Sequence, residues 1–221
     1  MYLPSQFAPK DRTHALELLR THAFASLISS DDEGTPFVSH IPLHLEDRTA
    51  AGAPAHSDWV LLGHVARGNA HWRYLESRPR ALVTFMGPHA FMSTRVYPDL
   101  VRVPTWSYLA VHCTVQARLV NEPDAKDRLL KKLIADHDPV YAEQWRGLSE
   151  DYAGKMLSAI VGFELQVTDV QCKIKLNQHR PESHARMHEL YAAGSEDERA
   201  LAQWMERLGL TGVEKGQGGP A

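Results

Sequence analysis

The chain has 221 residues, of which 43% are hydrophobic and 23% charged, and its formal net charge is −3. This composition is typical of a globular protein, and the negative charge disfavours broad electrostatic binding to a nucleic-acid backbone. No apolar run is long enough to span a membrane and the N-terminus lacks a secretory signal, so we expect a cytoplasmic protein without membrane partners. The thirteen histidines show no metal-ligand spacing, so we expect no metal site.

The first part of the chain predicts a helix followed by three strands. The expected elements are a helix over 11–22 and strands over 24–30, 37–45 and 59–65. Asp11 can cap the helix, and a turn-forming cluster at 31–36 joins the first two strands into a hairpin. Pro42 indicates an edge strand or a break in the ladder, because proline cannot donate to a ladder.

The rest of the chain predicts three more strands, with helices inserted between them and at the C-terminus. The expected elements are a helix over 70–77, strands over 81–85, 109–120 and 161–170, a helix opening at 122–124, and one or two C-terminal helices. Gly87-Pro88-His89 is expected to break a strand, and residues 92–106 to form an extended loop. The six strands do not alternate regularly with helices, which favours an antiparallel barrel with peripheral helices over a parallel sheet.

The segment 63–72 is the strongest candidate for ligand binding. An apolar strand ends at Val65, Arg67-Gly68-Asn69 forms a basic turn, and a helix begins immediately. Free amide groups and the dipole of a helix start favour an anion, and Arg67 adds a forked cation. The segment therefore indicates a phosphorylated ligand, although an ordinary capped helix with a surface arginine would have the same pattern.

Two further polar segments lie at strand ends, where loops often carry function. Residues 103–108 combine Trp106, which can cover a flat ring, with hydroxyls that can bond its polar edge. Residues 173–180 offer Lys175 as a cation and Gln178 as a donor and acceptor. A packed anchor tryptophan and a solvated strand end are the alternative interpretations. Together the three segments suit a phosphorylated aromatic cofactor without identifying which one.

The sequence shows no nucleophile and base in a recognisable arrangement. Ser26, Ser29, Ser39 and Ser93 lack the setting of a nucleophile elbow, and Glu164 is a strand carboxylate without an evident partner. Any redox chemistry would therefore have to come from a cofactor.

In the three polar segments described above, and in several other blocks, the chain resembles the PaiB-type family, the FMN-binding negative transcriptional regulators. The resembling blocks occur in order and cover roughly residues 1–180; they are residues 1–7, 19–25, 39–43, 63–69, 85–89, 103–106 and 175–178. The chain departs from the family pattern at Ser107, where the family usually has Asn, at Val96, where it tends to have Trp, and at His179.

The resemblance implies a split barrel that binds FMN at the interface of a homodimer. With the six strands read from the sequence, the expected fold is a six-stranded antiparallel split barrel, mainly β with peripheral α. The cofactor-binding residues it implies are His64, Arg67 and Asn69 at the phosphate, Trp106, Ser107 and Tyr108 near the ring, and Lys175 and Gln178 closing the site. The expected domains are a split barrel over 1–180, to which the resemblance extends, and, from the sequence pattern, a helical extension over 181–211 and a disordered tail over 212–221.

Three functions remain open at this stage. The first is an FMN-binding regulator and the second a flavin-dependent oxidoreductase acting on a small or haem-like substrate. The third is a DNA-binding repressor, which the sequence supports weakly because the arginines of the C-terminal helices are interleaved with acids.

Overall fold

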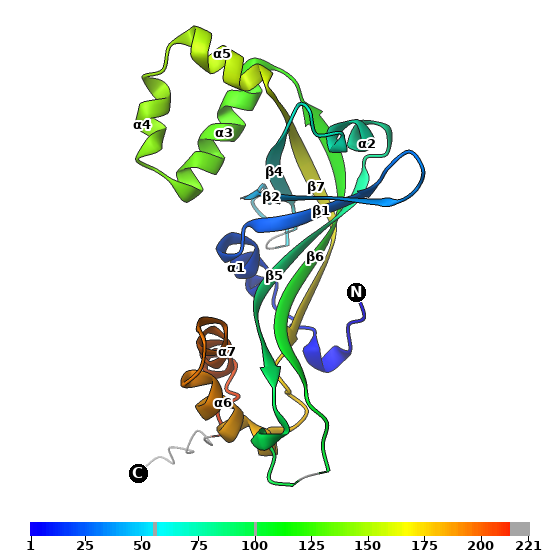
Figure 1. The fold of residues 1–221 in the computed structure, drawn as a ribbon, viewed down its shortest axis with the longest axis vertical. Helices are drawn as coiled ribbons and strands as arrows, with labels where there is room; N and C mark the ends of the chain where they lie inside the picture. The colour runs from blue at the N-terminus through cyan, green and yellow to red at the C-terminus, as the bar shows by residue number, and fades with distance from the viewer. Residues whose placement is uncertain (55–56, 100, 213–221) are drawn as a thin grey trace. The chain divides into compact units, whose positions relative to one another are not determined.

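The computed structural model describes residues 1–54, 57–99 and 101–212, and it contains a seven-stranded antiparallel sheet (Figure 1). The strands are β1 (Phe24–Ser30), β2 (Pro36–Pro42), β3 (His44–Asp47), β4 (Trp59–Ala66), β5 (Arg80–Met92), β6 (Thr105–Val120) and β7 (Ile160–Lys175). Their order in the sheet is β2-β1-β5-β6-β7-β4-β3. The expectation of a mainly β, antiparallel fold is thus confirmed.

The two outer strands of this order, β2 and β3, follow one another in the chain with Leu43 alone between them. The backbone N–H of Leu43 donates to the carbonyl of Ala23 at 3.0 Å, and its side chain is buried. The predicted single strand over 37–45 is therefore two strands, and the count of six was wrong by one. Pro42 does end an edge strand, as predicted, because β2 pairs only with β1 in the strand order. Within the described residues the sheet is open.

Three strands are longer than the sequence indicates. The prediction that Gly87-Pro88-His89 breaks the strand was wrong, because β5 continues to Met92. The buried positions change from Ala81, Val83 and Phe85 to Pro88, Ala90 and Met92. This one-residue shift in the alternation is what a β-bulge produces, and it lets the strand pass a proline. Likewise β6 begins at Thr105, before the predicted start at 109, and β7 runs to Lys175, beyond the predicted end at 170.

The chain forms two compact units. Unit 1 consists of Met1–Lys10, Met86–Ala110 and the residues from Cys172 on, and unit 2 of Asp11–Phe85 and Val111–Gln171. Unit 2 contains α1 (Thr13–Thr21), α2 (His71–Ser77), α3 (Pro123–His137), α4 (Tyr141–Arg146) and α5 (Glu150–Ser158). Unit 1 contains α6 (His184–Ala192), α7 (Glu196–Arg207) and the short 3-10 helices η1 (Ser5–Phe7), η2 (Thr94–Val96) and η3 (Pro181–Ser183). The domain boundaries expected at 180 and 211 stay a prediction, and residues 213–221 of the expected tail lie outside the described part.

Each unit buries the apolar stripe of its helices. In unit 2, Leu129 and Leu133 of α3 pack with Val60, Leu62 and Val120, so the helix lies against β4. In unit 1, α7 is held at its start by a reciprocal capping box between Ser195 and Glu198, and it buries Leu201, Trp204 and Met205. None of the helices in the described ranges is long and apolar enough to cross a membrane.

Candidate functional site

The turn between β4 and α2, in unit 2, places the arginine of the predicted anion site at the surface. Arg67 Nε donates to the carbonyl of Ser158 at 2.8 Å, and its Nη2 donates to that of Ile160 at 3.3 Å. These carbonyls lie at the end of α5 and the start of β7, so they hold the side chain in one place. The Nη1 group makes no hydrogen bond to the described residues, which leaves one arm of the fork for a ligand.

Asn69 and His71 fix the other side of this turn through a buried network. Asn69 Oδ1 accepts from the backbone N–H of His71 at 2.9 Å, so its side chain bonds the first residue of α2 although the N-cap position is occupied by Ala70. Its Nδ2 donates to Ser39 Oγ at 3.0 Å, and Ser39 Oγ lies 2.9 Å from His71 Nδ1. His71 is 0% exposed, and burial lowers the pKa of its ring from 6.5 to about 4. The ring is therefore neutral near pH 7 and can accept from the Ser39 hydroxyl.

His64, on β4, carries a polar atom that no described residue satisfies. Its Nδ1 is buried without a hydrogen-bond partner, and burial lowers the pKa of the ring. A buried polar atom left unpaired costs about 1–3 kcal/mol, so it points to a group that the protein alone does not supply. This orphan atom, close in the chain to Arg67, fits the predicted binding of a phosphorylated ligand.

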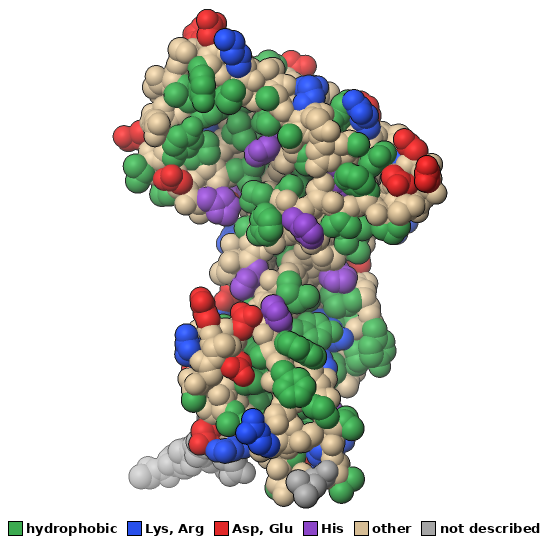
Figure 2. Space-filling view, in the orientation of Figure 1, with side chains coloured by type: hydrophobic (Ala, Val, Ile, Leu, Met, Phe, Trp, Pro, Cys, Tyr) green, Lys and Arg blue, Asp and Glu red, His purple; other side chains and the backbone are tan. Residues whose placement is uncertain are grey.

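An exposed aromatic surface lies in unit 1, on one face of β5 and β6. Trp106 is 53% exposed and Phe91 51% exposed, and their ring centroids are 6.2 Å apart in an edge-on arrangement. The ring of His89 lies 6.2 Å from that of Trp106 on the same face. Figure 2 shows hydrophobic side chains gathered on the unit that contains α6 and α7. Such an exposed apolar surface is typical of a binding or association site.

Two lysines of β7 accompany Tyr108. Lys173 Nζ lies 5.2 Å and Lys175 Nζ 5.8 Å from the centre of the Tyr108 ring, within cation–π range. Lys175 Nζ also donates to Thr105 Oγ1 at 2.6 Å, and Lys173 Nζ to the carbonyl of Tyr2 at 3.0 Å. Burial, and then the charge of Lys173, lower the pKa of Lys175. The structure thus brings the predicted residues Tyr108 and Lys175 together.

Ser107 and Gln178 make other contacts within unit 1. Ser107 is 1% exposed and accepts a hydrogen bond from the Tyr191 hydroxyl at 3.0 Å, on the strand face opposite to Trp106 and Tyr108. Burial raises the pKa of Tyr191 to about 12, which keeps this donor protonated. Gln178 Oε1 accepts from the backbone N–H of Leu176 at 2.9 Å and its Nε2 donates to the Ile174 carbonyl, so its amide closes the turn after β7.

The sequence indicated the candidate site residues, but it did not predict the side chains that contact them. Ser39 and His71 bond across 32 positions of the sequence, so no local motif reveals them. Lys173 was within reach of the sequence, because it stands two positions before Lys175 and thus on the same strand face. In the described part of the chain there is no group of three or more histidine, cysteine, aspartate or glutamate side chains able to hold a metal ion.

Comparison with solved structures identifies the fold. The flavocytochrome Anf3 from Azotobacter vinelandii is 17% identical, with a TM-score of 0.60, covering 77% of this chain and 70% of that one. The FAD and heme binding protein from Mycobacterium smegmatis is 18% identical, with a TM-score of 0.58, covering 76% of this chain and 72% of that one. At these identities the likeness shows a shared fold.

Comparison of sequences identifies the family. Protease synthase and sporulation protein PAI 2 of Bacillus subtilis (strain 168) is 31% identical over 187 residues, covering 83% of this chain and 84% of that protein. Residues 1–169 match the family described as "Putative FMN-binding domain". The resemblance to the PaiB-type family is thereby confirmed, and the chain belongs to this family of FMN-binding proteins.

Proposed function

We propose that this protein is a cytoplasmic, homodimeric FMN-binding regulator of split-barrel fold, with the flavin at the dimer interface. Membership of the FMN-binding family supports the cofactor, and the relation to a sporulation protein supports a regulatory role. The succession of the edge strands β2 and β3 supports a split barrel, because a sheet whose edges are joined by one residue must curl.

The observation that carries the proposal is the pair of unsatisfied groups near the β4–α2 turn. Among the residues that the structure describes, the buried His64 Nδ1 has no hydrogen-bond partner, and Arg67, anchored by two backbone carbonyls, has none at Nη1. We assign His64, Arg67 and Asn69 to the FMN phosphate. Asn69 contributes through the turn that it braces, since both ends of its amide are bonded within the protein.

The ring assignment rests on the residues of unit 1. The exposed Trp106 and the half-buried Tyr108 offer flat surfaces, and Lys175 places a cation beside Tyr108. Ser107 and Gln178 support the ring site from its flanks through the contacts they make to Tyr191 and to the end of β7. The exposed side chains of Met86, Phe91 and Trp106 give the chain an apolar surface that a second copy can cover.

Replacement of Arg67 by alanine tests the phosphate assignment. The loss of a charge-assisted contact should weaken FMN binding by about 1.5–3 kcal/mol, which is roughly a tenfold to 150-fold rise in Kd. Flavin fluorescence or visible absorbance during titration of the apoprotein measures it. Arg73→Ala is the matched control, because that guanidinium lies over Trp72 on α2. Equal FMN affinity of Arg67→Ala and the control would show that the phosphate binds elsewhere.

DNA is the partner that a regulator would address, and α7 is a poor recognition helix. Its first turn carries Glu196, Asp197 and Glu198, which would repel phosphates at the end that usually enters the major groove. A gel-shift titration at several salt concentrations tests for DNA: a steep salt dependence is expected of direct binding, and no shift at low salt would assign regulation to a protein or small-molecule partner.

The exposed aromatic surface of unit 1 favours a second candidate function, a flavin-dependent oxidoreductase acting on a small or haem-like substrate. Trp106, Phe91 and His89 together can receive a flat molecule. Rapid reduction of the bound flavin by a nicotinamide nucleotide, followed by turnover of an acceptor, would support this function. Failure with a broad panel of acceptors would exclude it in favour of the regulator.

A further inference from the structure

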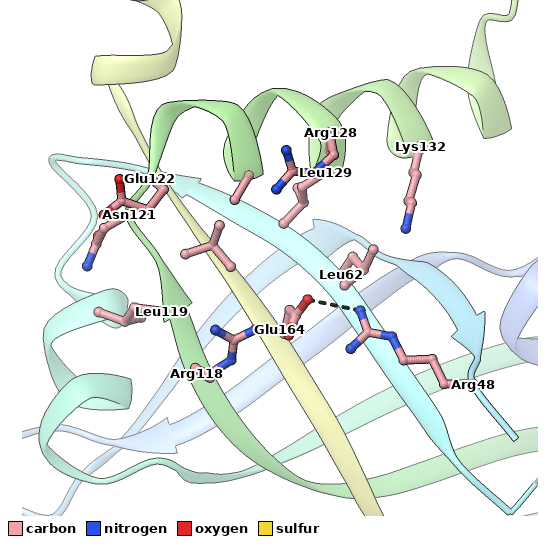
Figure 3. Close-up of a pocket in the computed structure, with 12 residues that line it drawn as sticks. Arg48, Leu62, Arg118, Leu119, Asn121, Glu122, Arg128, Leu129, Lys132 and Glu164 are labelled. Carbon is pink, nitrogen blue, oxygen red and sulfur yellow. Dashed lines mark hydrogen bonds and ion pairs between the residues drawn. The ribbon is translucent and has the colours of Figure 1, made fainter. Parts of the chain in front are cut away.

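A cleft of about 530 Å³ lies in unit 2 between α3 and the strands β4, β6 and β7 (Figure 3). In Figure 3 Arg128 and Lys132 descend from α3 on one side, and Arg118, Glu164 and Arg48 lie on the strand side. The floor between them is apolar and is formed by Leu62, Val120, Ala125 and Leu129. The volume is that of a small-molecule site.

The strand side of the cleft is a fixed ionic network. Arg48 Nη2 donates to Glu164 Oε1 at 2.9 Å, and Arg118 Nη2 donates to Glu164 Oε2 at 2.5 Å. The hydrogen bond from Arg48, with that from Arg118, holds the pKa of Glu164 below its usual value. Glu46 Oε2 accepts a hydrogen bond from Arg48 Nε at 2.6 Å, and the same carboxylate forms an ion pair with Lys132. Both carboxylates therefore favour the ionised form, and each of their four oxygens accepts from a cation.

The cations exceed the carboxylates. Arg48, Arg118, Arg128 and Lys132 line the cleft together with only two acids, Glu122 and Glu164. Even when Glu46 is added, four positive charges face three negative ones. Arg128 has no hydrogen bond or ion pair with the described residues, and Arg118 keeps its Nε and Nη1 free of bonds within the same part of the chain. Guanidinium forks of this kind match the geometry of a carboxylate.

We propose that this cleft binds a small carboxylic acid with a short apolar body, as an effector site. The carboxylate would bond to the free arms of Arg118 and Arg128, and the body would cover Leu62, Ala125 and Leu129. The surplus of one positive charge matches a monoanion. None of the residues assigned to the flavin lines the cleft, so the site goes beyond the proposed function.

Calorimetric titration of the full-length, FMN-loaded protein tests the site with 3-phenylpropionate as probe. The uncharged 3-phenylpropanol lacks the carboxylate, and acetate lacks the apolar body, so both should bind at least about tenfold more weakly than the probe. Saturable binding of the probe is expected, and its absence up to about 10 mM would overturn the proposal. Equal binding of acetate would reduce the site to a simple ion site and would also overturn it.

Two variants and a control locate the binding. Arg128→Gln removes an exposed, unpartnered charge without disturbing the network, and should weaken the probe about fivefold to tenfold. Ala125→Leu fills the floor and should weaken it similarly. Arg146→Gln, an exposed arginine of α4 outside the cleft, should change nothing. The flavin spectrum and FMN affinity should stay the same in all three. A loss of FMN with Arg128→Gln would mean that the cleft holds the flavin phosphate, which would overturn the separate site.

Discussion

The buried network below the β4–α2 turn predicts a specific pH dependence of stability. His71 is 0% exposed, its Nδ1 contacts Ser39 and its Nε2 has no hydrogen-bond partner among the described residues, so protonation would place an unsatisfied charge in the interior. Replacing His71 by asparagine keeps an acceptor close to Ser39 and removes the titration. The difference in unfolding free energy between the two proteins therefore isolates this one group.

The magnitude follows from the two pKa values of the ring. In the folded protein burial lowers the pKa from 6.5 to about 4, so between these values the unfolded chain binds more protons. The contribution of the neutral ring is complete above pH 6.5 and is lost as the pH falls toward 4. Linkage gives a loss of about 2 kcal/mol between pH 7.5 and pH 5, and about 3 kcal/mol in full.

Urea denaturation at pH 7.5, 6 and 5 measures the effect in the apoprotein. Because of the cavity that asparagine leaves, His71→Asn should be less stable than the parent by about 2 kcal/mol at pH 7.5. That difference should shrink nearly to zero at pH 5, since only the parent loses stability through this ring. A difference for His71→Asn that stays constant from pH 7.5 to pH 5 would refute the argument that the ring is buried in its neutral form.

Two further substitutions test the packing around the candidate sites, each by urea denaturation at pH 7.5. Gly63→Ala would bring a Cβ within 2.5 Å of Leu43 Cδ2, so it should lower the unfolding free energy by about 1–3 kcal/mol. At Gly68 an added Cβ meets nothing within 4 Å, so Gly68→Ala should lower it by less than about 1 kcal/mol. Similar losses for the two variants would contradict the close packing at Gly63. Tyr191→Phe leaves the buried Ser107 hydroxyl without its donor and should cost about 1–2 kcal/mol, and an unchanged unfolding free energy would show that this bond contributes nothing.

The sequence predicts the elements of the fold where periodicity is strong. The predicted strand 59–65 is β4 almost to the residue, because a long apolar run has few other interpretations. Pro42 indicated an edge or a break in the ladder, and the structure has both, with the break at Leu43. The passage of β5 through Pro88 was not predicted, because Gly-Pro is locally a signal for the end of a strand. The backbone N–H of Leu43 donates to the carbonyl of Ala23, which lies far earlier in the sequence, and no local pattern specifies that partner.

In the candidate site, too, residues marked by a local sequence pattern were predicted, whereas contacts between residues far apart in the sequence were not. Arg67 and Asn69 stand out in the sequence since strand, turn and helix start lie within ten residues. Glu164 has no partner within its own segment, yet Arg48 and Arg118 bind it across separations of 116 and 46 positions. The basic cleft could not be predicted from the sequence for that reason. Its residues come from the end of β3 and from β4, β6, α3 and β7, and only the folded chain brings them together.

The residues at which this chain departs from its family's pattern make contacts within unit 1. Ser107 faces the core and bonds to Tyr191, so the difference at this position changes an interior contact rather than the surface that carries Trp106 and Tyr108. Val96 is buried, and His179 packs edge-on to Phe7 at 5.7 Å. Because the surface that would face a flavin ring is built from the opposite side of β6, these substitutions leave its aromatic and cationic groups in place. Flavin affinity should therefore depend more on Trp106 and Tyr108 than on Ser107.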